Sequence, residues 1–352
     1  MKLGFYSFDV APGNNIAILA AEARRRGHEV VDPEKQKPVS DRAMVELMTC
    51  DMVVTGLSSF KTEMELDVAR YLKNETKWVV LEDVPESCLR PKARDFANRA
   101  DLLLMAPHTK PEDAARFGFR RNICLGPPPL WGKEYNELIA AKEANVRQNM
   151  EKVVMGGNPI QLQTSDVVVG LVGGKDSPIN DLVLGMLIQA LAGHHKAVVG
   201  FSQHPGEKAT KPEDEERFTR AFQERAEMLS RIWHLSKNWK GVEVGAVADV
   251  MIYAGGTNAS ISGAYARIPG IYLDLPEVRA RMVTQSGKET WFVAELGGAL
   301  VVDNKEDLGP MIKTALSNEG RQYLLDMQEK NFPLPEDWHT EKKIIDYLEC
   351  LV

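Results

Sequence analysis

The stretch DVMIYAGGTNASISGAYARIPGIYLD, residues 249–274, decides the fold. It begins with an apolar strand, continues through a glycine-rich turn and a helix of small residues, and ends in a second apolar strand. Two strands joined through a helix run parallel, because a parallel pair needs a crossover connection. The stretch therefore predicts a β-α-β unit within a parallel sheet.

The composition is that of a globular protein with two domains. The chain has 352 residues, of which 44% are hydrophobic and 26% charged, and its formal net charge is −7. This length suits two domains that each bury a core. The negative charge argues against nucleic acid as the main partner. The four cysteines, Cys50, Cys88, Cys124 and Cys350, form no CxxC pair, so we expect neither a zinc site nor a disulfide framework.

No stretch has the pattern of a signal peptide, and no apolar run approaches the roughly 18 residues of a membrane span. We therefore expect a cytoplasmic protein without a transmembrane segment. This expectation rests on hydropathy and on the absence of a leader pattern in the sequence.

The first half of the chain alternates between apolar strands and helical stretches. A strand at 2–8 is followed by a turn at 9–15 and by a helix at 16–31, which closes at Gly27 before the next strand. Further strands are predicted at 51–57, 77–83, 100–106 and 122–126. This alternation indicates a Rossmann-like domain over residues 1–130.

A second alternating series follows a connection at 131–165, which combines proline, glycine and a solvated helix. Over 166–335 we predict strands at 166–172, 196–202, 249–254, 270–274 and 298–303, a helix at about 213–235 and a short segment near 242–246. Residues 336–352 form a predicted amphipathic helix. The fold class is therefore α/β, with two Rossmann-like domains facing a cleft.

Ligands of parallel α/β sheets bind beyond the carboxyl ends of the strands, so the loops there are candidate sites. Gly255 and Gly256 let the backbone approach a ligand, while Thr257, Asn258 and Ser260 offer donors at the start of the next helix. A helix N-terminus favours phosphate or a sugar hydroxyl. The alternative is a plain N-cap in a tight turn.

Two other loops of the second half follow the carboxyl ends of strands and therefore lie at the same edge of the predicted sheet. Gly173, Gly174 and Lys175 follow the strand 166–172 and are suited to holding a phosphate. The loop after the strand 196–202 adds four candidates: His204, Pro205, Gly206 and Glu207. Pro205 would stiffen that turn, and the histidine is equally compatible with a purely structural role.

The first half offers polar side chains after several of its strands. Glu82 and Asp83 end the strand 77–83, where carboxylates can serve as acid or base. Candidates for contact with a sugar or acceptor are Gly13, Asn14, Asn15, Ser58, Ser59 and His108. Helix capping is the alternative for the serines, and solvated loop charge is the alternative for the carboxylates.

Several enzyme classes lack their motifs in this chain. There is no HExxH, no GxSxG and no Walker P-loop, so a metalloprotease, a serine hydrolase and a P-loop kinase have no support. The run GGKDS at 173–177 is similar to the phosphate loop of ATP pyrophosphatases, although valine precedes it here where serine is usual. An ATP pyrophosphatase therefore stays an alternative.

These segments together resemble the GT-B superfamily, the twin-Rossmann glycosyltransferases and their relatives, which include UDP-N-acetylglucosamine 2-epimerase-like proteins. The resemblance rests on ARRRGHEVV (23–31), on ADVMIYAGGTNASISGAYARIPGIYLD (248–274) and on the His-Pro turn of FSQHPGE (201–207). TGLSSFKTEMELDVARYL (55–72) followed by VVLEDVPE (79–86) is similar to bacterial members with a serine-rich turn.

The resemblance implies a metal-independent glycosyltransferase without a cofactor, which takes a nucleoside-diphosphate sugar as co-substrate. The second domain would bind this donor through its glycine loops and His204. The first domain would bind the acceptor and supply a base, for which Asp83, Glu82 and Asp9 are candidates. Lys175 and helix amides would stabilise the leaving diphosphate. The helix 336–352 would pack back on the first domain, and a homodimer stays open.

Two departures from the family pattern leave other functions open. The helix after Gly-Gly-Thr carries Ser260 and Ser262 where relatives often have a ribose-binding glutamate, and Ser-Gln-His-Pro stands where Arg-Pro-His-Pro is expected. One alternative is a UDP-sugar epimerase or hydrolase, which needs carboxylates converging with His204. The other is a binding protein of the same fold without turnover.

Overall fold

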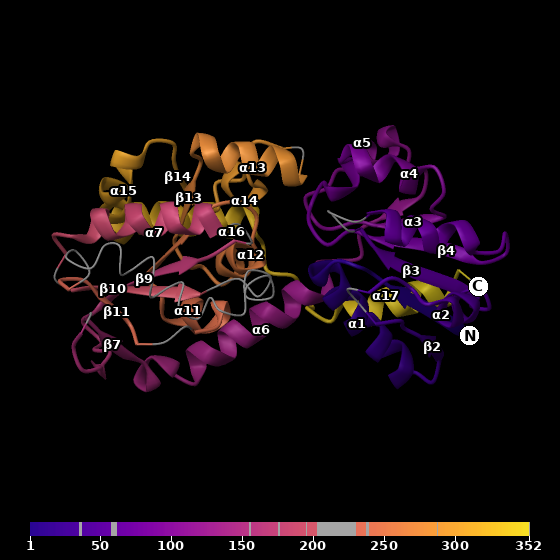
Figure 1. Cartoon of the computed structure of the whole chain (residues 1–352), viewed down its shortest axis with the longest axis horizontal. Coiled ribbons are helices and arrows are strands. Elements are labelled where there is room, and N and C mark those ends of the chain that lie inside the picture. Colours follow the sequence, from indigo (N-terminus) through magenta and orange to yellow (C-terminus); the bar gives the residue numbers. More distant parts are fainter. Residues whose placement is uncertain are drawn as a thin grey trace. The chain divides into compact units, whose positions relative to one another are not determined.

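The computed structural model describes residues 1–351 except 35–36, 58–61, 155, 175–176, 195, 203–229, 237–238 and 287. The chain divides into two compact units, which Figure 1 colours along the sequence. Unit 1 comprises Met1–Lys133, Gln285–Gly287 and Pro335–Val352, and unit 2 comprises Glu134–Thr284 and Lys288–Leu334. Within the described ranges, no helix combines the length and the apolar character needed to cross a membrane.

The described part of unit 1 is built on a six-stranded sheet of order β2-β1-β3-β4-β5-β6, in which every pair is parallel. Its strands are β1 (Lys2–Tyr6), β2 (Glu29–Val31), β3 (Met52–Gly56), β4 (Lys77–Leu81), β5 (Leu102–Leu104) and β6 (Asn122–Ile123). The chain leaves β1 towards β2 on one side and continues with β3 on the other. This reversal creates a topological switch point at the carboxyl ends of β1 and β3.

Side chains alternate between the two faces of this sheet, because successive residues of a strand point to opposite sides. Leu3, Phe5 and Val54 face one core, whereas Val80 and Leu103 belong to the core on the other face. The helical segments of the unit are α1 (Val10–Arg25), α2 (Asp41–Leu47), α3 (Thr62–Tyr71), η1 (Ser87–Leu89), η2 (Pro91–Ala93), α4 (Arg94–Ala97), α5 (Pro111–Phe117) and α17 (Thr340–Glu349).

The predicted return of the C-terminal helix is confirmed. Figure 1 shows α17, in yellow, beside the indigo α1, and the two helices contact each other. Ile344, Ile345 and Leu348 of α17 are buried in the same core as Leu19 of α1. Outside this core, Arg26 pairs with Glu22 and Asp346, and His28 Nε2 lies 2.7 Å from Glu349 Oε1.

The expected turn at 9–15 is wrong, because α1 begins at Val10. Pro12 occupies the first turn of the helix, where the backbone N–H has no helical partner, so proline is tolerated there. The N–H of Gly13 donates to the Asp9 carbonyl at 2.9 Å and closes the first turn. The predicted end of the helix is confirmed, since Gly27 has a φ of +86°.

Unit 2 contains an eight-stranded sheet in its described part, of order β14-β13-β12-β9-β10-β11-β7-β8. Its strands are β7 (Glu151–Val153), β8 (Ile160–Gln161), β9 (Val167–Val172), β10 (Ala197–Ser202), β11 (Trp233–Leu235), β12 (Val250–Tyr253), β13 (Gly270–Leu273) and β14 (Leu300–Val302). The pairs from β14 to β11 are parallel, and β7 and β8 add an antiparallel edge. The switch point of this sheet lies between β9 and β12.

Helices cover both faces of the second sheet. They are α6 (Pro129–Glu143, which begins in unit 1), η3 (Val146–Asn149), α7 (Ser177–Leu191), α11 (Gly241–Val247), α12 (Asn258–Tyr265), α13 (Pro276–Ser286), α14 (Phe292–Glu295), η5 (Lys305–Asp307), α15 (Leu308–Leu316) and α16 (Asn318–Asn331). Figure 1 shows α7 and α15 on one side of the strands and α11 on the other. In this doubly wound arrangement the loops that can bind a ligand lie beyond the carboxyl ends of the strands.

Two segments of unit 2 differ from the sequence expectations. Of the helix predicted at about 213–235, residues 213–229 lie outside the described residues and Trp233–Leu235 form strand β11. The short segment near 242–246 is part of helix α11. The predicted connection 131–165 contributes α6 and the two edge strands β7 and β8. The fold class itself is confirmed as α/β with two parallel-sheet units.

Candidate functional site

The switch point of unit 2 brings two glycine turns together. β9 and β12 are neighbours, with Val172 opposite Tyr253, and the two turns follow these residues directly. A Cβ placed on Gly174 would lie 3.7 Å from the carbonyl oxygen of Ala254. Gly173 and Gly174 therefore adjoin the turn that begins with Gly255, as the strand pattern predicts. Ligand binding by these turns stays a prediction.

The first turn is held by Asn180, a residue that the sequence reading passed over. Its side-chain oxygen accepts from the Gly174 N–H, and its amide nitrogen donates to the Gly174 carbonyl, each at 2.9 Å. Asn180 is buried, and the Gly173 N–H donates to the Ser202 carbonyl at 2.9 Å. Gly174 thus has a fixed peptide plane, while a Cβ added to it would contact, among the described residues, only Ala254 of the second turn. The signal was present in the sequence as an asparagine in the first turn of α7.

In the second turn, Gly255 has a φ of +82°, a conformation that favours glycine. Thr257 is the N-cap of α12, and its hydroxyl oxygen accepts from the Ala259 N–H at 3.4 Å. Asn258 is the first residue of the helix. The turn therefore presents backbone and short polar side chains at a helix N-terminus, which suits an anion or a sugar hydroxyl.

Gly256 and Ser260 have internal partners in this turn. A Cβ on Gly256 would lie 2.6 Å from the Trp291 ring, so glycine is required by the packed indole. Ser260 Oγ accepts from Trp291 Nε1 at 2.9 Å and donates to the Thr257 carbonyl at 2.6 Å. Gly256 and Ser260 therefore fix the conformation of the turn through their contacts with the Trp291 indole.

Asp274, after β13, is another carboxylate that the sequence reading did not select. It is 8% exposed, and its Oδ2 accepts from Arg279 at 2.8 Å. Its Oδ1 is buried and has no hydrogen-bond partner among the described residues. The signal was the same as at Glu82 and Asp83, namely an acidic residue at the end of an apolar strand.

In unit 1, Glu82 ties together the loops that follow β4 and β5. Its buried carboxylate accepts from the Cys88 N–H at 3.0 Å, the Ala106 N–H at 3.0 Å, the Thr109 hydroxyl at 2.7 Å and the Ser87 hydroxyl at 3.4 Å. Burial raises the pKa of Glu82, and the hydrogen bonds oppose this rise. These contacts assign the carboxylate to positioning the two loops.

The two loops joined by Glu82 each contain a residue with left-handed backbone. Glu86 has a φ of +62° and His108 a φ of +73°, which are uncommon for residues other than glycine. The Glu86 N–H donates to the Thr109 hydroxyl at 2.7 Å, so the same network holds one of these conformations. Burial lowers the pKa of His108 and favours its neutral ring. Residues with such backbone conformations cluster at active sites and ligand-binding sites.

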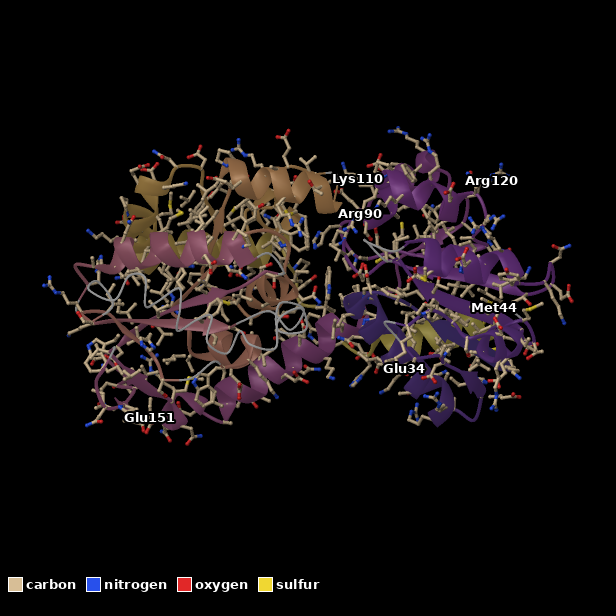
Figure 2. All side chains as sticks on the ribbon, viewed as in Figure 1. Glu34, Met44, Arg90, Lys110, Arg120 and Glu151 are labelled. Carbon is tan, nitrogen blue, oxygen red and sulfur yellow. The ribbon has the colours of Figure 1, made fainter. Side chains whose placement is uncertain are left out.

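Asp83, Asp9 and Arg90 share one electrostatic environment at this edge of unit 1. Asp83 is 6% exposed, and Arg90 is half-buried. Burial lowers the pKa of Arg90, while the carboxylates of Asp83, Glu82 and Asp9 oppose this shift. Figure 2 shows the Arg90 side chain on the same side of unit 1 as Lys110, the N-cap of α5. The structure therefore brings together Asp9, Asp83 and a cation that the sequence reading did not select.

The predicted acceptor residues of α1 are buried or half-buried. Asn15 is 1% exposed, and its side-chain oxygen accepts from the Leu130 N–H at 2.7 Å. Gly13 is buried inside the first turns of α1, and Asn14 is half-buried. Asn15 therefore joins α1 to the start of α6.

Several sequence candidates lie outside the described residues: Ser58, Ser59, Lys175, His204, Pro205, Gly206 and Glu207. The described residues contain no group of three or more His, Cys, Asp or Glu side chains arranged to hold a metal ion. Each unit therefore has its own candidate region: the turns after β9 and β12 in unit 2, and the loops after β1, β4 and β5 in unit 1.

Solved structures of known proteins share this architecture over the whole chain. MurG of Acinetobacter baumannii has a TM-score of 0.59 at 14% sequence identity, covering 99% of this chain and 98% of that chain. S. aureus MnaA, in a co-structure with UDP, has a TM-score of 0.64 at 12% identity, covering 99% and 95%. UDP-GlcNAc 2-epimerase from Neisseria meningitidis, bound to UDP-GlcNAc, has a TM-score of 0.58 at 10% identity, covering 99% of both chains.

The similar structures are GT-B glycosyltransferases and UDP-GlcNAc 2-epimerases. The chain therefore has the GT-B fold, as its resemblance to that superfamily predicts. No protein-family model matches the sequence, and no curated protein matches it. At 10–14% identity the likeness defines the fold and not the reaction.

Proposed function

We propose that the chain is a GT-B enzyme that binds a nucleoside-diphosphate sugar in unit 2 and transfers the sugar to an acceptor bound in unit 1. The observation that supports donor binding best is the convergence of the Gly173–Gly174 and Gly255–Asn258 turns at the switch point of the second sheet. Ligands of doubly wound sheets bind at that place. UDP in the MnaA co-structure and UDP-GlcNAc in the meningococcal epimerase agree with a nucleotide-sugar ligand.

The donor diphosphate would lie against the two glycine turns and the N-terminal ends of α7 and α12. Unpaired amides and the positive end of a helix stabilise phosphate oxygens. The same groups would stabilise the charge that develops on the leaving diphosphate, a task that many other enzymes give to a metal ion. The reaction we propose therefore uses neither a metal nor a further cofactor.

Asp83 and Asp9 are the proposed bases for the acceptor hydroxyl. They share the environment of Arg90, whose pKa burial lowers and their carboxylates raise. Glu82 would hold the loop that carries Asp83 in position. His108 would contact the acceptor. Proton removal from the hydroxyl in the transition state would raise its nucleophilicity.

Titration calorimetry with UDP, CDP, GDP and ADP tests donor binding, and UDP-sugars follow if UDP binds. Gly174→Leu fills the space beside Ala254 and should weaken nucleotide binding at least tenfold, which corresponds to about 1.4 kcal/mol. Ser165→Leu is the matched control, because Ser165 is exposed before β9 at the opposite end of the strand. Equal affinities for the two variants, or no binding of any nucleotide, would exclude the proposed donor site.

Epimerisation or hydrolysis of a UDP-sugar is the second candidate. It is favoured by the meningococcal epimerase among the similar structures and by the carboxylates Asp9, Asp83 and Glu82 at one edge of unit 1. Incubation with the bound UDP-sugar in the absence of an acceptor separates the two reactions. A new sugar epimer or free sugar indicates an epimerase or hydrolase, whereas a stable donor excludes both and leaves a transferase or a binding protein. Nucleotide binding without turnover under either condition indicates a binding protein.

A further inference from the structure

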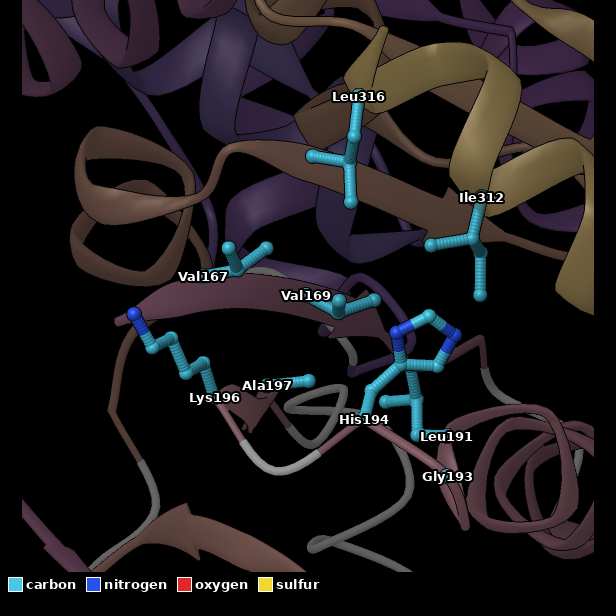
Figure 3. Close-up of a pocket in the computed structure, with 9 residues that line it drawn as sticks. All are labelled: Val167, Val169, Leu191, Gly193, His194, Lys196, Ala197, Ile312 and Leu316. Carbon is cyan, nitrogen blue, oxygen red and sulfur yellow. The ribbon is translucent and has the colours of Figure 1, made fainter. Parts of the chain in front are cut away.

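A cavity of about 400 Å³ opens at the amino ends of β9 and β10 in unit 2 (Figure 3). Its floor is apolar and consists of residues that are each 5% exposed or less: Val169, Leu191, Ala197 and Ile312. Its rim carries Val167, Gly193, His194, Lys196 and Leu316. The volume lies at the lower end of the range of small-molecule sites.

This cavity is separate from the candidate donor turns. Val167 is the first residue of β9, whereas Gly173 follows its last residue, and the strand has six residues. Six residues of strand span about 20 Å, at roughly 3.3 Å per residue. The cavity also has walls from the end of α7 and from α15, and no residue of its lining belongs to the glycine turns.

The polar groups of the rim favour an anion. Lys196 is exposed, and none of the described residues forms an ion pair with it. His194 is half-buried and has a ring N–H donor in either tautomer. Figure 3 shows the Lys196 ammonium and the His194 ring on either side of Ala197. A ligand matched to this arrangement has an apolar body and one negative end.

We propose that this cavity binds a medium-chain monocarboxylate, with the alkyl chain against Val169, Leu191 and Ile312 and the carboxylate at Lys196. Alkyl burial supplies affinity in proportion to the apolar area removed from water. The cationic rim selects a carboxylate over an alcohol of the same length. This proposal is independent of the proposed function, since it uses neither the donor turns nor the loops of unit 1.

Titration calorimetry of the full chain with hexanoate, heptanoate and octanoate tests the proposal. Each added methylene should tighten binding about fourfold, which is the value of one buried methylene group. Octanol should bind more weakly than octanoate. Addition of saturating UDP should leave the octanoate affinity unchanged, because the two sites lie at opposite ends of β9.

Two kinds of variant locate the site. Lys196→Glu replaces attraction by repulsion and should weaken octanoate binding about tenfold. Lys313→Glu makes the same charge change at an exposed position of α15 outside the lining and should leave the affinity unchanged. Leu316→Trp and Ala197→Leu fill the cavity from two sides, and either variant that keeps the wild-type circular dichroism spectrum should lose octanoate binding.

Absence of saturable octanoate binding up to about 10 mM would overturn the proposal, because this concentration is about ten times a millimolar Kd. The proposal is equally overturned if octanol binds as tightly as octanoate, if UDP displaces octanoate, or if Lys196→Glu and Lys313→Glu bind octanoate alike.

Discussion

The turn after β12 permits a sharp test, because one methyl group at Gly256 meets a fixed indole. The Cβ of Gly256→Ala would lie 2.6, 2.9 and 3.0 Å from three ring carbons of Trp291. The indole is 6% exposed and packs edge-on against Phe292 with ring centroids 4.8 Å apart. Its Nε1 donates to Ser260 Oγ at 2.9 Å. The hydrogen bond and the contact with Phe292 therefore hold the ring in place.

These contacts set the expected magnitude. An extra methyl in a packed region costs about 1–3 kcal/mol, and loss of the hydrogen bond to Ser260 adds about 1 kcal/mol. We expect the free energy of unfolding of unit 2 to fall by about 3 kcal/mol. For a unit of this size the midpoint temperature should fall by roughly 6–12 °C.

Urea unfolding followed by far-UV circular dichroism measures this loss, with Gly174→Ala as the matched control. Within the described part of the chain, a Cβ at Gly174 meets only the Ala254 carbonyl, at 3.7 Å, and the φ of Gly174 lies outside the left-handed region. Gly174→Ala should therefore change stability by less than about 0.5 kcal/mol. If the two alanine variants have the same stability, Trp291 does not buttress the turn and the argument for Gly256 is refuted.

Three further predictions concern buried charge. Asp166→Ala should destabilise unit 2 by about 3–5 kcal/mol in urea unfolding, because it leaves the buried Lys152 ammonium unpaired. Adding Lys152→Met should recover most of this lost stability, and no recovery would contradict the account. Burial lowers the pKa of His108 and His234 from 6.5, so the unfolded chain binds more protons and stability should fall below about pH 6.5, by at most about 1.4 kcal/mol per pH unit for each histidine. Replacing each histidine by glutamine should flatten this slope, and an unchanged slope would refute its assignment. Glu82→Gln sets an amide among four donors and should destabilise unit 1 by about 2 kcal/mol, whereas wild-type stability would show that those hydrogen bonds contribute little.

Most of the fold is predictable from the sequence, because strands of parallel sheets are short apolar runs with their own boundaries. The runs at 51–57, 166–172 and 249–254 became β3, β9 and β12, the central strands of the two sheets. The errors arose where local chemistry permits two structures. APGNN reads as a turn, yet proline is tolerated in a first helical turn, and α1 therefore begins at Val10.

The candidate site is predictable only in part. Strand order follows from the β-α-β alternation, and it brings Gly174 and Gly255 to one edge. The role of Gly256 depends on Trp291, and the role of Glu82 depends on Thr109, which are distant in sequence. Local patterns identify the turns but not the side chains that fix them from elsewhere in the chain.

The contact between α1 and α17 has a consequence for biosynthesis. A ribosome completes residues 134–334 before it reaches the helix that closes the core around Leu19. The N-terminal unit therefore emerges early with an apolar groove still open, while the second unit is translated in full. Premature termination before Ile344 would release a polypeptide with that groove exposed, a substrate for chaperones and proteases.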